Sequence, residues 1–95
     1  DLADYAKKII EMFDGEEHEV EFVCDNELMK SVIDKFGESV ITKRINEGQF
    51  KVIVRVAVSK TFYAWAFRFA GQMQIVAPKK VKKEYQEMAR KVLEG

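Results

Sequence analysis

The segment 39–58 constrains the fold of this chain more than any other stretch of its sequence. Two stretches rich in β-branched residues, 39–46 and 49–58, flank the turn-forming sequence Asn46–Gln49. Such an arrangement is typical of a β-hairpin. We expect a two-residue loop in which Gly48 takes a positive φ, because glycine accepts that backbone conformation without steric cost.

A loop formed by residues 47–48 also sets the register of the hairpin, with Arg44 opposite Lys51 and Ile41 opposite Val54. Side chains alternate between the two faces of a strand, so this register predicts a core face and a polar face. The predicted core face holds Ile41, Ile45, Phe50, Val52, Val54, Val56 and Val58. The predicted polar face holds Thr42, Arg44, Lys51, Ile53, Arg55 and Ala57.

The rest of the chain alternates between helical and strand periodicity. The predicted elements, in chain order, are an amphipathic helix over 2–13, a strand over 17–24, a helix capped by Asp25 or Asn26 and ending at Phe36-Gly37, a helix over 59–70, a strand over 73–77 and a last helix from Pro78. Residues 1–15 are interpreted as a leading linker helix, and residues 16–95 as one domain.

The strand-helix-strand-strand-helix-strand order predicts an α+β fold, the ferredoxin-like βαββαβ sandwich with extra N- and C-terminal helices. Its four-stranded antiparallel sheet has helices on one face and leaves the other face open. The first strand then lies beside the third. We therefore expect Glu19 and Glu21 to face Lys51 and Arg55 across the open face.

Charge is distributed unevenly along a chain whose net charge is zero. Residues 1–38 carry 12 acidic and 4 basic side chains, whereas residues 39–95 carry 4 acidic and 12 basic ones. The two halves either neutralise each other in the fold or leave a basic region that faces an anion. The apolar runs are too short to span a bilayer and no signal peptide opens the chain, so we expect a cytoplasmic domain without membrane contact.

Catalysis has no support in the sequence, and we predict that the chain is not an enzyme. His18 and Cys24 are separated by six residues of strand, about 20 Å, which is too far for a catalytic dyad. One histidine and one cysteine make a transition-metal site improbable, and no glycine-rich phosphate loop is present. We expect no cofactor, with Cys24 as a buried apolar side chain and His18 at the surface.

The strongest candidate contact residues are Arg44, Lys51 and Arg55, which the predicted register places together on the open face. They either dock an anion or a neighbouring domain, or are neutralised by Glu19 and Glu21. Four lysines near Pro78 leave the same choice between an anion site and a solvated helix face. An RNA-recognition motif is disfavoured, because the open face lacks the aromatic residues that stack bases.

Aromatic side chains gather on the predicted helix over 59–70. Most of them follow the apolar stripe and are expected in the core. Tyr63 and Phe67 lie off that stripe, which makes them the candidates for a surface that faces a partner.

Several short motifs resemble the end of a WYL-domain transcriptional regulator. They are the sequence from Phe62 to Gly71 around Trp65, followed by Val76-Ala77-Pro78 before the last helix. The alternating strand, the Phe36-Gly37 helix end and the hairpin around Gly48 are similar as well. The resemblance spans nearly the whole chain and is to the C-terminal extension domain called WCX.

This resemblance implies a C-terminal regulatory and oligomerisation domain of a bacterial, dimeric transcription factor. The implied partners are the WYL sensor domain of the same or the other subunit, and a nucleotide or single-stranded nucleic acid as the effector. DNA would be read by an N-terminal helix-turn-helix that these residues do not contain. The alternative is a stand-alone small-ligand or protein-interaction module unrelated to transcription.

Overall fold

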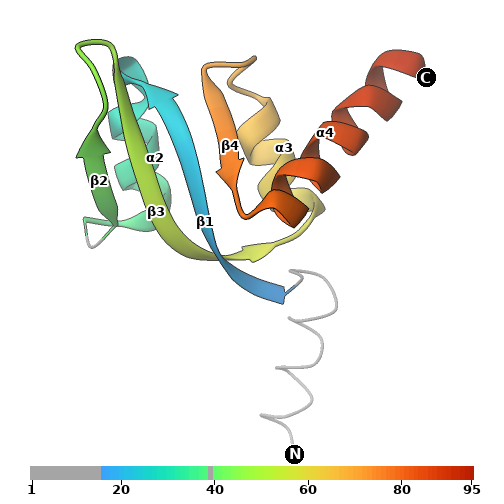
Figure 1. Cartoon of the computed structure of the whole chain (residues 1–95), viewed down its shortest axis with the longest axis horizontal. Helices are drawn as coiled ribbons and strands as arrows, with labels where there is room; N and C mark the ends of the chain where they lie inside the picture. The colour runs from blue at the N-terminus through green and yellow to red at the C-terminus, as the bar shows by residue number, and fades with distance from the viewer. Residues whose placement is uncertain (1–15, 39) are drawn as a thin grey trace, which may run out of the picture.

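The computed structural model describes residues 16–38 and 40–95 (Figure 1). Its elements are β1 (Glu16–Asp25), a short 3-10 helix η1 (Asn26–Leu28), α2 (Met29–Phe36), β2 (Ile41–Arg44), β3 (Gln49–Val58), α3 (Lys60–Phe67), β4 (Met73–Ala77) and α4 (Lys79–Glu94). The helix predicted over residues 2–13 lies outside the described residues.

The four strands form one antiparallel sheet in the order β2-β3-β1-β4. Along β1, buried and more exposed residues alternate, with Val20, Phe22 and Cys24 fully buried. This period of two means that one face of the sheet is packed and the other is not. The predicted mixed α+β architecture with a four-stranded antiparallel sheet is confirmed, and so is the position of the first strand beside the third.

The core lies between the packed face of the sheet and the helices. Figure 1 shows α2 and α3 on the same side of the sheet. They contribute the buried side chains of Val32, Phe62 and Ala66, which meet the inward side chains of β1, β3 and β4. Burial of apolar area on this scale is the main stabilising contribution in so small a domain.

Most predicted elements are present, and the differences between predicted and observed bounds lie at the ends of the elements. β3 and β4 have the predicted bounds. Ser59 begins α3 as an N-cap, because its Oγ accepts a hydrogen bond of 3.3 Å from the backbone N–H of Phe62. The helix stops at Phe67, earlier than predicted, since Ala70 and Gly71 take φ values of 52° and 89° and turn the chain toward β4.

The predicted hairpin register is wrong by one residue. β2 pairs with β3 so that Ile41 lies opposite Ile53 and Arg44 lies opposite Phe50. A one-residue shift moves every side chain of a strand to the other face. Ile41 therefore lies on the open face with 53% of its surface exposed, and not in the core.

The cause of the shift is a loop of three residues, 46–48, in place of two. The backbone N–H groups of Ile45 and Asn46 both donate to the carbonyl oxygen of Gln49, at 3.1 and 3.4 Å. The Asn46 side-chain oxygen accepts a hydrogen bond of 2.8 Å from the N–H of Gly48, which closes an Asx turn. Gly48 does not take the predicted positive φ; among the described glycines, Gly37 and Gly71 do.

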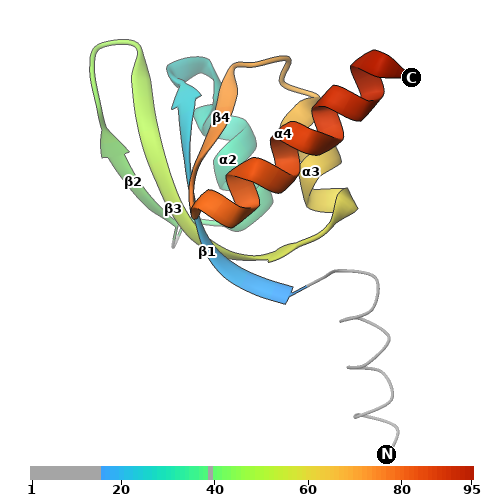
Figure 2. The same cartoon turned by 45° about the vertical axis from the view of Figure 1, so that its right-hand side comes forward.

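The last helix, α4, packs beside α3 and then extends away from the sheet (Figure 2). Its anchor is Val81, which is buried, with Tyr85 and Met88 packed partly against the core. Near its end Leu93 is 85% exposed. No helix in the described part of the chain is both long and apolar enough to cross a bilayer.

Candidate functional surface: the open face of the sheet

We use the term open face for the outward side chains of the sheet. Sheet pairing and strand alternation define its members. They are Glu17, Glu19, Glu21, Val23 and Asp25 of β1, Gln49, Lys51, Ile53, Arg55 and Ala57 of β3, Ile41 and Lys43 of β2, and Gln74 and Val76 of β4.

Two ion pairs join β1 and β3 across the open face. Lys51 Nζ lies 2.8 Å from Glu21 Oε1, and Arg55 Nε lies 3.2 Å from Glu17 Oε2. Both pairs are diagonal, because Lys51 lies directly opposite Val23 and Arg55 directly opposite Glu19. The expected neutralisation of Lys51 by Glu21 is therefore present, whereas the ion-pair partner of Arg55 is Glu17 and not the predicted Glu19.

These two ion pairs differ in how far their side chains are exposed to solvent. The side chains of Lys51 and Glu21 are about one-third exposed, at 35% and 32%. Those of Arg55 and Glu17 are 66% and 64% exposed, so water and salt screen their attraction. The Lys51–Glu21 pair is thus the better ordered feature at the centre of the surface.

The predicted cluster of Arg44, Lys51 and Arg55 is only partly assembled. Lys51 and Arg55 both project from β3 on the open face. Arg44 lies opposite Phe50, on the side of the sheet that faces the helices, and its Nε donates to the carbonyl oxygen of Asn46 at 3.3 Å. Lys43 takes the place predicted for Arg44, directly opposite Lys51.

Sequence reasoning missed Lys43 and Ile41 as members of the open face, because it assumed the shorter loop. The signal was Asn46, whose side chain can close an Asx turn and so lengthen the loop. With Lys43 included, the open face carries three cations, and with Asp25 it carries four carboxylates. The positive and negative charges of its side chains therefore differ by only one, and Ile41, Ile53, Val23 and Val76 add apolar area.

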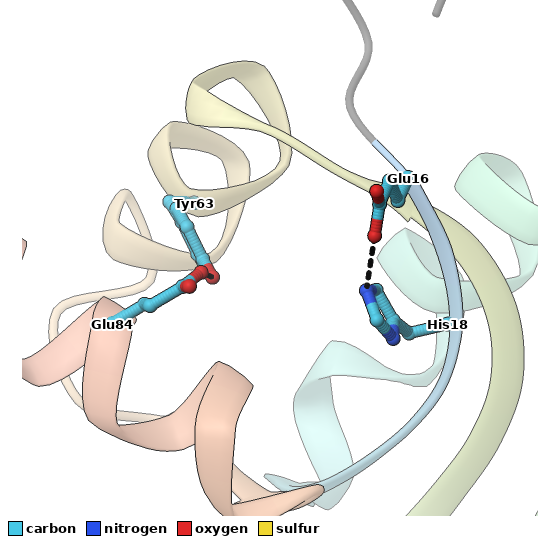
Figure 3. Close-up of polar contacts among 4 residues, drawn as sticks. All are labelled: Glu16, His18, Tyr63 and Glu84. Atoms are coloured by element: carbon cyan, nitrogen blue, oxygen red, sulfur yellow. Dashed lines mark hydrogen bonds and ion pairs between the residues drawn. The ribbon is translucent and has the colours of Figure 1, made fainter.

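Tyr63 is not the partner-facing residue that its sequence position indicated. It is 6% exposed, and its hydroxyl donates a hydrogen bond of 2.9 Å to Glu84 Oε2 of α4 (Figure 3). Burial, together with the hydrogen bond to Glu84, raises the pKa of Tyr63 above its usual range. The pair links α4 to α3. Phe67 is 44% exposed.

Cys24 and His18 occupy separate environments. Cys24 is fully buried, and desolvation, with a smaller contribution from the charge of Asp25, raises the pKa of its thiol to about 12. The thiol therefore stays protonated and unreactive, as expected for a core residue. His18 is half-exposed, and its Nε2 lies 3.7 Å from Glu16 Oε2 (Figure 3).

Metal-binding side chains do not gather in the structure. Over residues 16–38 and 40–95, no group of three or more His, Cys, Asp or Glu side chains is placed to hold an ion. Within that same part of the chain, the ordered polar features are ion pairs and single hydrogen bonds.

Comparison with known protein families agrees with this architecture. The family model of the WCX domain matches residues 16–93, which include every strand and helix described above except the last residue of α4. Among curated proteins, nothing matches the chain. The match covers most of the sequence, so the chain belongs to the WCX domain family, the C-terminal extension of WYL-domain regulators.

Proposed function

We propose that this chain is the regulatory and oligomerisation end of a bacterial transcription factor, and that its open face docks onto the WYL sensor domain of the same or the partner subunit. The observation that carries the proposal is the open face itself, a sheet surface on which the charges nearly balance and apolar side chains are exposed. Lys51 and Arg55 are the proposed contact residues, whereas Arg44 lies on the side of the sheet that faces the helices.

The near balance of positive and negative charges on the open face favours a protein surface over a nucleic acid as its binding partner. Binding to a phosphate backbone draws its free energy from cations that release counterions. Here Lys51 and Arg55 already pair with Glu21 and Glu17, and Glu19 adds a third carboxylate nearby. A nucleotide or single-stranded nucleic acid effector would have to displace these carboxylates, whereas a protein surface of complementary charge would not.

Docking regulates the transcription factor if its affinity differs between two arrangements of the dimer. An effector that binds one arrangement more tightly shifts the population toward it and so repositions the DNA-reading heads. In this proposal the WCX domain transmits this change in population, because its open face binds the sensor domain. In this proposal the protein acts in the bacterial cytoplasm. Its role involves no catalytic step.

The test compares two double variants with the same change in charge. Lys51→Glu/Arg55→Glu alters the open face, and Lys35→Glu/Arg68→Glu alters the helix layer. Calorimetry measures the affinity of each for the WYL domain of the same regulator, supplied as a separate polypeptide. We expect the open-face variant to bind at least about tenfold more weakly, because it buries like charges in the interface, and the helix-layer variant to match the parent.

A second titration separates docking from effector binding. A labelled short single-stranded DNA is added at low and then at moderate salt, and its anisotropy is followed. The proposal predicts no salt-sensitive binding through Lys51 and Arg55. It would be overturned by equal sensor-domain affinity of the open-face variant and the parent, or by DNA binding that the open-face variant loses.

For the domain as a whole, we propose that residues 16–95 form one unit of the ferredoxin-like type, with residues 1–15 as a leading segment. The strand-helix-strand-strand-helix-strand order and the pairing of β1 with both β3 and β4 support this assignment. Superposition on solved ferredoxin-like domains would test it.

A further inference from the structure

β2 forms an edge of the sheet that has no neighbouring strand on its outer side. The strand order is β2-β3-β1-β4, and Figures 1 and 2 show no labelled element beyond β2. All residues of β2, Ile41–Arg44, are exposed. Within the part of the chain that the structure describes, this edge is therefore accessible along its whole length.

The backbone of β2 directs the N–H and C=O groups of two residues outward. The N–H of Ile45 donates to the carbonyl oxygen of Gln49 at 3.1 Å, so the backbone groups of Ile45 point toward β3. This orientation alternates along an antiparallel strand, and those of Thr42 and Arg44 therefore point away from β3. Unpaired groups of this kind are the pairing sites that an added strand uses.

Two cations lie at this edge, one on each face of the sheet. Lys43 is on the open face, and Arg44 is on the side that faces the helices. Neither has a carboxylate within ion-pair distance among residues 16–38 and 40–95. Lys43 also lies directly opposite Lys51, whose own partner is Glu21. A carboxylate beside Lys43 would relieve this like-charge contact.

Exposed apolar side chains accompany the cations. Ile41 and Ile45 are 53% and 48% exposed, and Ile41 lies directly opposite Ile53 on the open face. An apolar residue on an added strand would cover part of this area. The other edge strand, β4, carries no charged side chain, so the chemistry of the two edges differs.

We propose that the β2 edge binds an extended acidic segment of a partner protein, which adds a strand antiparallel to β2. The segment pairs its backbone with Thr42 and Arg44. Read from its N-terminus, it carries two adjacent acidic residues opposite Arg44 and Lys43, one further residue, and an apolar residue opposite Ile41. A second β2 strand would bring only further cations to this edge, which disfavours pairing between two copies of the chain.

This proposal goes beyond the docking of the open face, because the contact is made by the backbone edge of β2. The probe is a synthetic peptide, Thr-Val-Glu-Glu-Thr-Val-Thr with blocked termini, titrated into the ¹⁵N-labelled 95-residue chain. We expect saturable shifts of amide NMR signals centred on Thr42 and Arg44, and slower hydrogen exchange of these two amides. The same peptide with lysines in place of its glutamates should bind at least about tenfold more weakly.

Two methylated peptides test for strand pairing. In the proposed register, the N–H of the threonine that follows the glutamates points toward Thr42, and the N–H of the second glutamate points away from β2. Methylation of the threonine nitrogen should weaken binding at least about tenfold, because it removes a backbone hydrogen bond and adds a clash. Methylation of the second glutamate nitrogen should change the affinity by less than about threefold.

Variants of the chain assign the charge contribution to the edge. Lys43→Gln/Arg44→Gln should weaken binding of the glutamate peptide by about fivefold or more, because it removes both facing cations. Lys82→Gln/Lys83→Gln makes the same change in net charge on exposed positions of α4 and should leave the affinity unchanged. Far-UV circular dichroism shows that each variant is folded.

The proposal is overturned if the parent shows no saturable shifts at β2. Equal affinities of the two methylated peptides would also overturn it, because the peptide would then be held by charge without strand pairing. So would equal losses in the two double variants. None of these measurements includes a sensor domain, so their outcome is independent of whether the open face docks onto one.

Discussion

Single residues in this domain show how backbone conformation and burial determine the effect of a substitution on stability. Gly37 ends α2 with a φ of 84°, a conformation that side chains with a Cβ rarely adopt. Gly48 lies in the hairpin loop without a positive φ, and a Cβ there would meet only Asn46 Oδ1, at 3.7 Å. Both glycines are exposed, so their difference is one of backbone conformation and not of packing.

We predict that Gly37→Ala lowers the free energy of unfolding by about 1 kcal/mol, because the added Cβ strains a positive-φ residue. Gly48→Ala should change it by less than about 0.5 kcal/mol, the range typical of unstrained surface positions. Urea titration of both variants measures the difference. Equal losses in the two variants would show that the φ of Gly37 carries no cost.

Three ionisable groups, the buried Cys24 and Tyr63 and the half-buried Tyr85, determine how stability depends on alkaline pH. The pKa of Cys24 is raised from 9.0 to about 12, and burial raises the pKa values of Tyr63 and Tyr85 as well. The unfolded chain loses these protons at lower pH than the folded one. Stability from these groups is therefore complete below about pH 9 and is lost as pH rises.

We expect the free energy of unfolding to fall between about pH 9 and 12, with a slope of up to about 1.4 kcal/mol per pH unit for each group. Cys24→Ala lowers stability overall but removes the share of the slope due to the thiol. Urea titrations at several pH values compare the two slopes. An unchanged slope in the variant would contradict the assigned role of Cys24.

At the scale of elements, the hairpin shows how a loop of three residues determines a surface. Asn46 closes the loop, β2 shifts by one position against β3, and Ile41 and Lys43 move to the open face. Lys43 then lies opposite Lys51, a like-charge pairing that is relieved in part by Glu21.

Exchange of one charge on β2 tests this register. Lys43→Glu should raise the free energy of unfolding by about 0.5 kcal/mol, because it places opposite charges across the strand pair. Arg44→Glu faces Phe50 and should bring no such gain. Thermal unfolding of both variants is the measurement. A gain for Arg44→Glu without one for Lys43→Glu would instead support the two-residue loop.

Across the whole molecule, α4 is held at its beginning and free at its end. Val81 is buried against the core, and Tyr63 binds Glu84 about one turn later. Val92 and Leu93 are exposed by 61% and 85%. The sheet and the other helices therefore need only the first part of α4 for their packing.

Val81→Ala should cost about 2 kcal/mol of unfolding free energy, because it leaves a cavity in the core. Removal of residues 92–95 should cost less than about 0.5 kcal/mol, because exposed side chains contribute little to folding. Urea titration of both forms gives the comparison. A large loss on truncation would mean that the exposed end of α4 is packed in the folded chain.

The sequence alone determined which elements form. Hydrophobic periodicity is a local property of a chain, and it located β3, β4 and the helices, the open face, and Lys51 and Arg55 on it. Gly37 marked the end of α2 for a similarly local reason, because glycine accepts a positive φ, whereas the capping hydrogen bond of Ser59 at the start of α3 came from the structure.

Only the tertiary structure decided the relations between elements. The pairing of Arg55 with Glu17, the exchange of Arg44 for Lys43, and the burial of Tyr63 under α4 each depend on residues distant in sequence or on a single loop residue. Hydrophobic periodicity carries no information about strand register or about contacts between elements, so these features are known only from the folded structure.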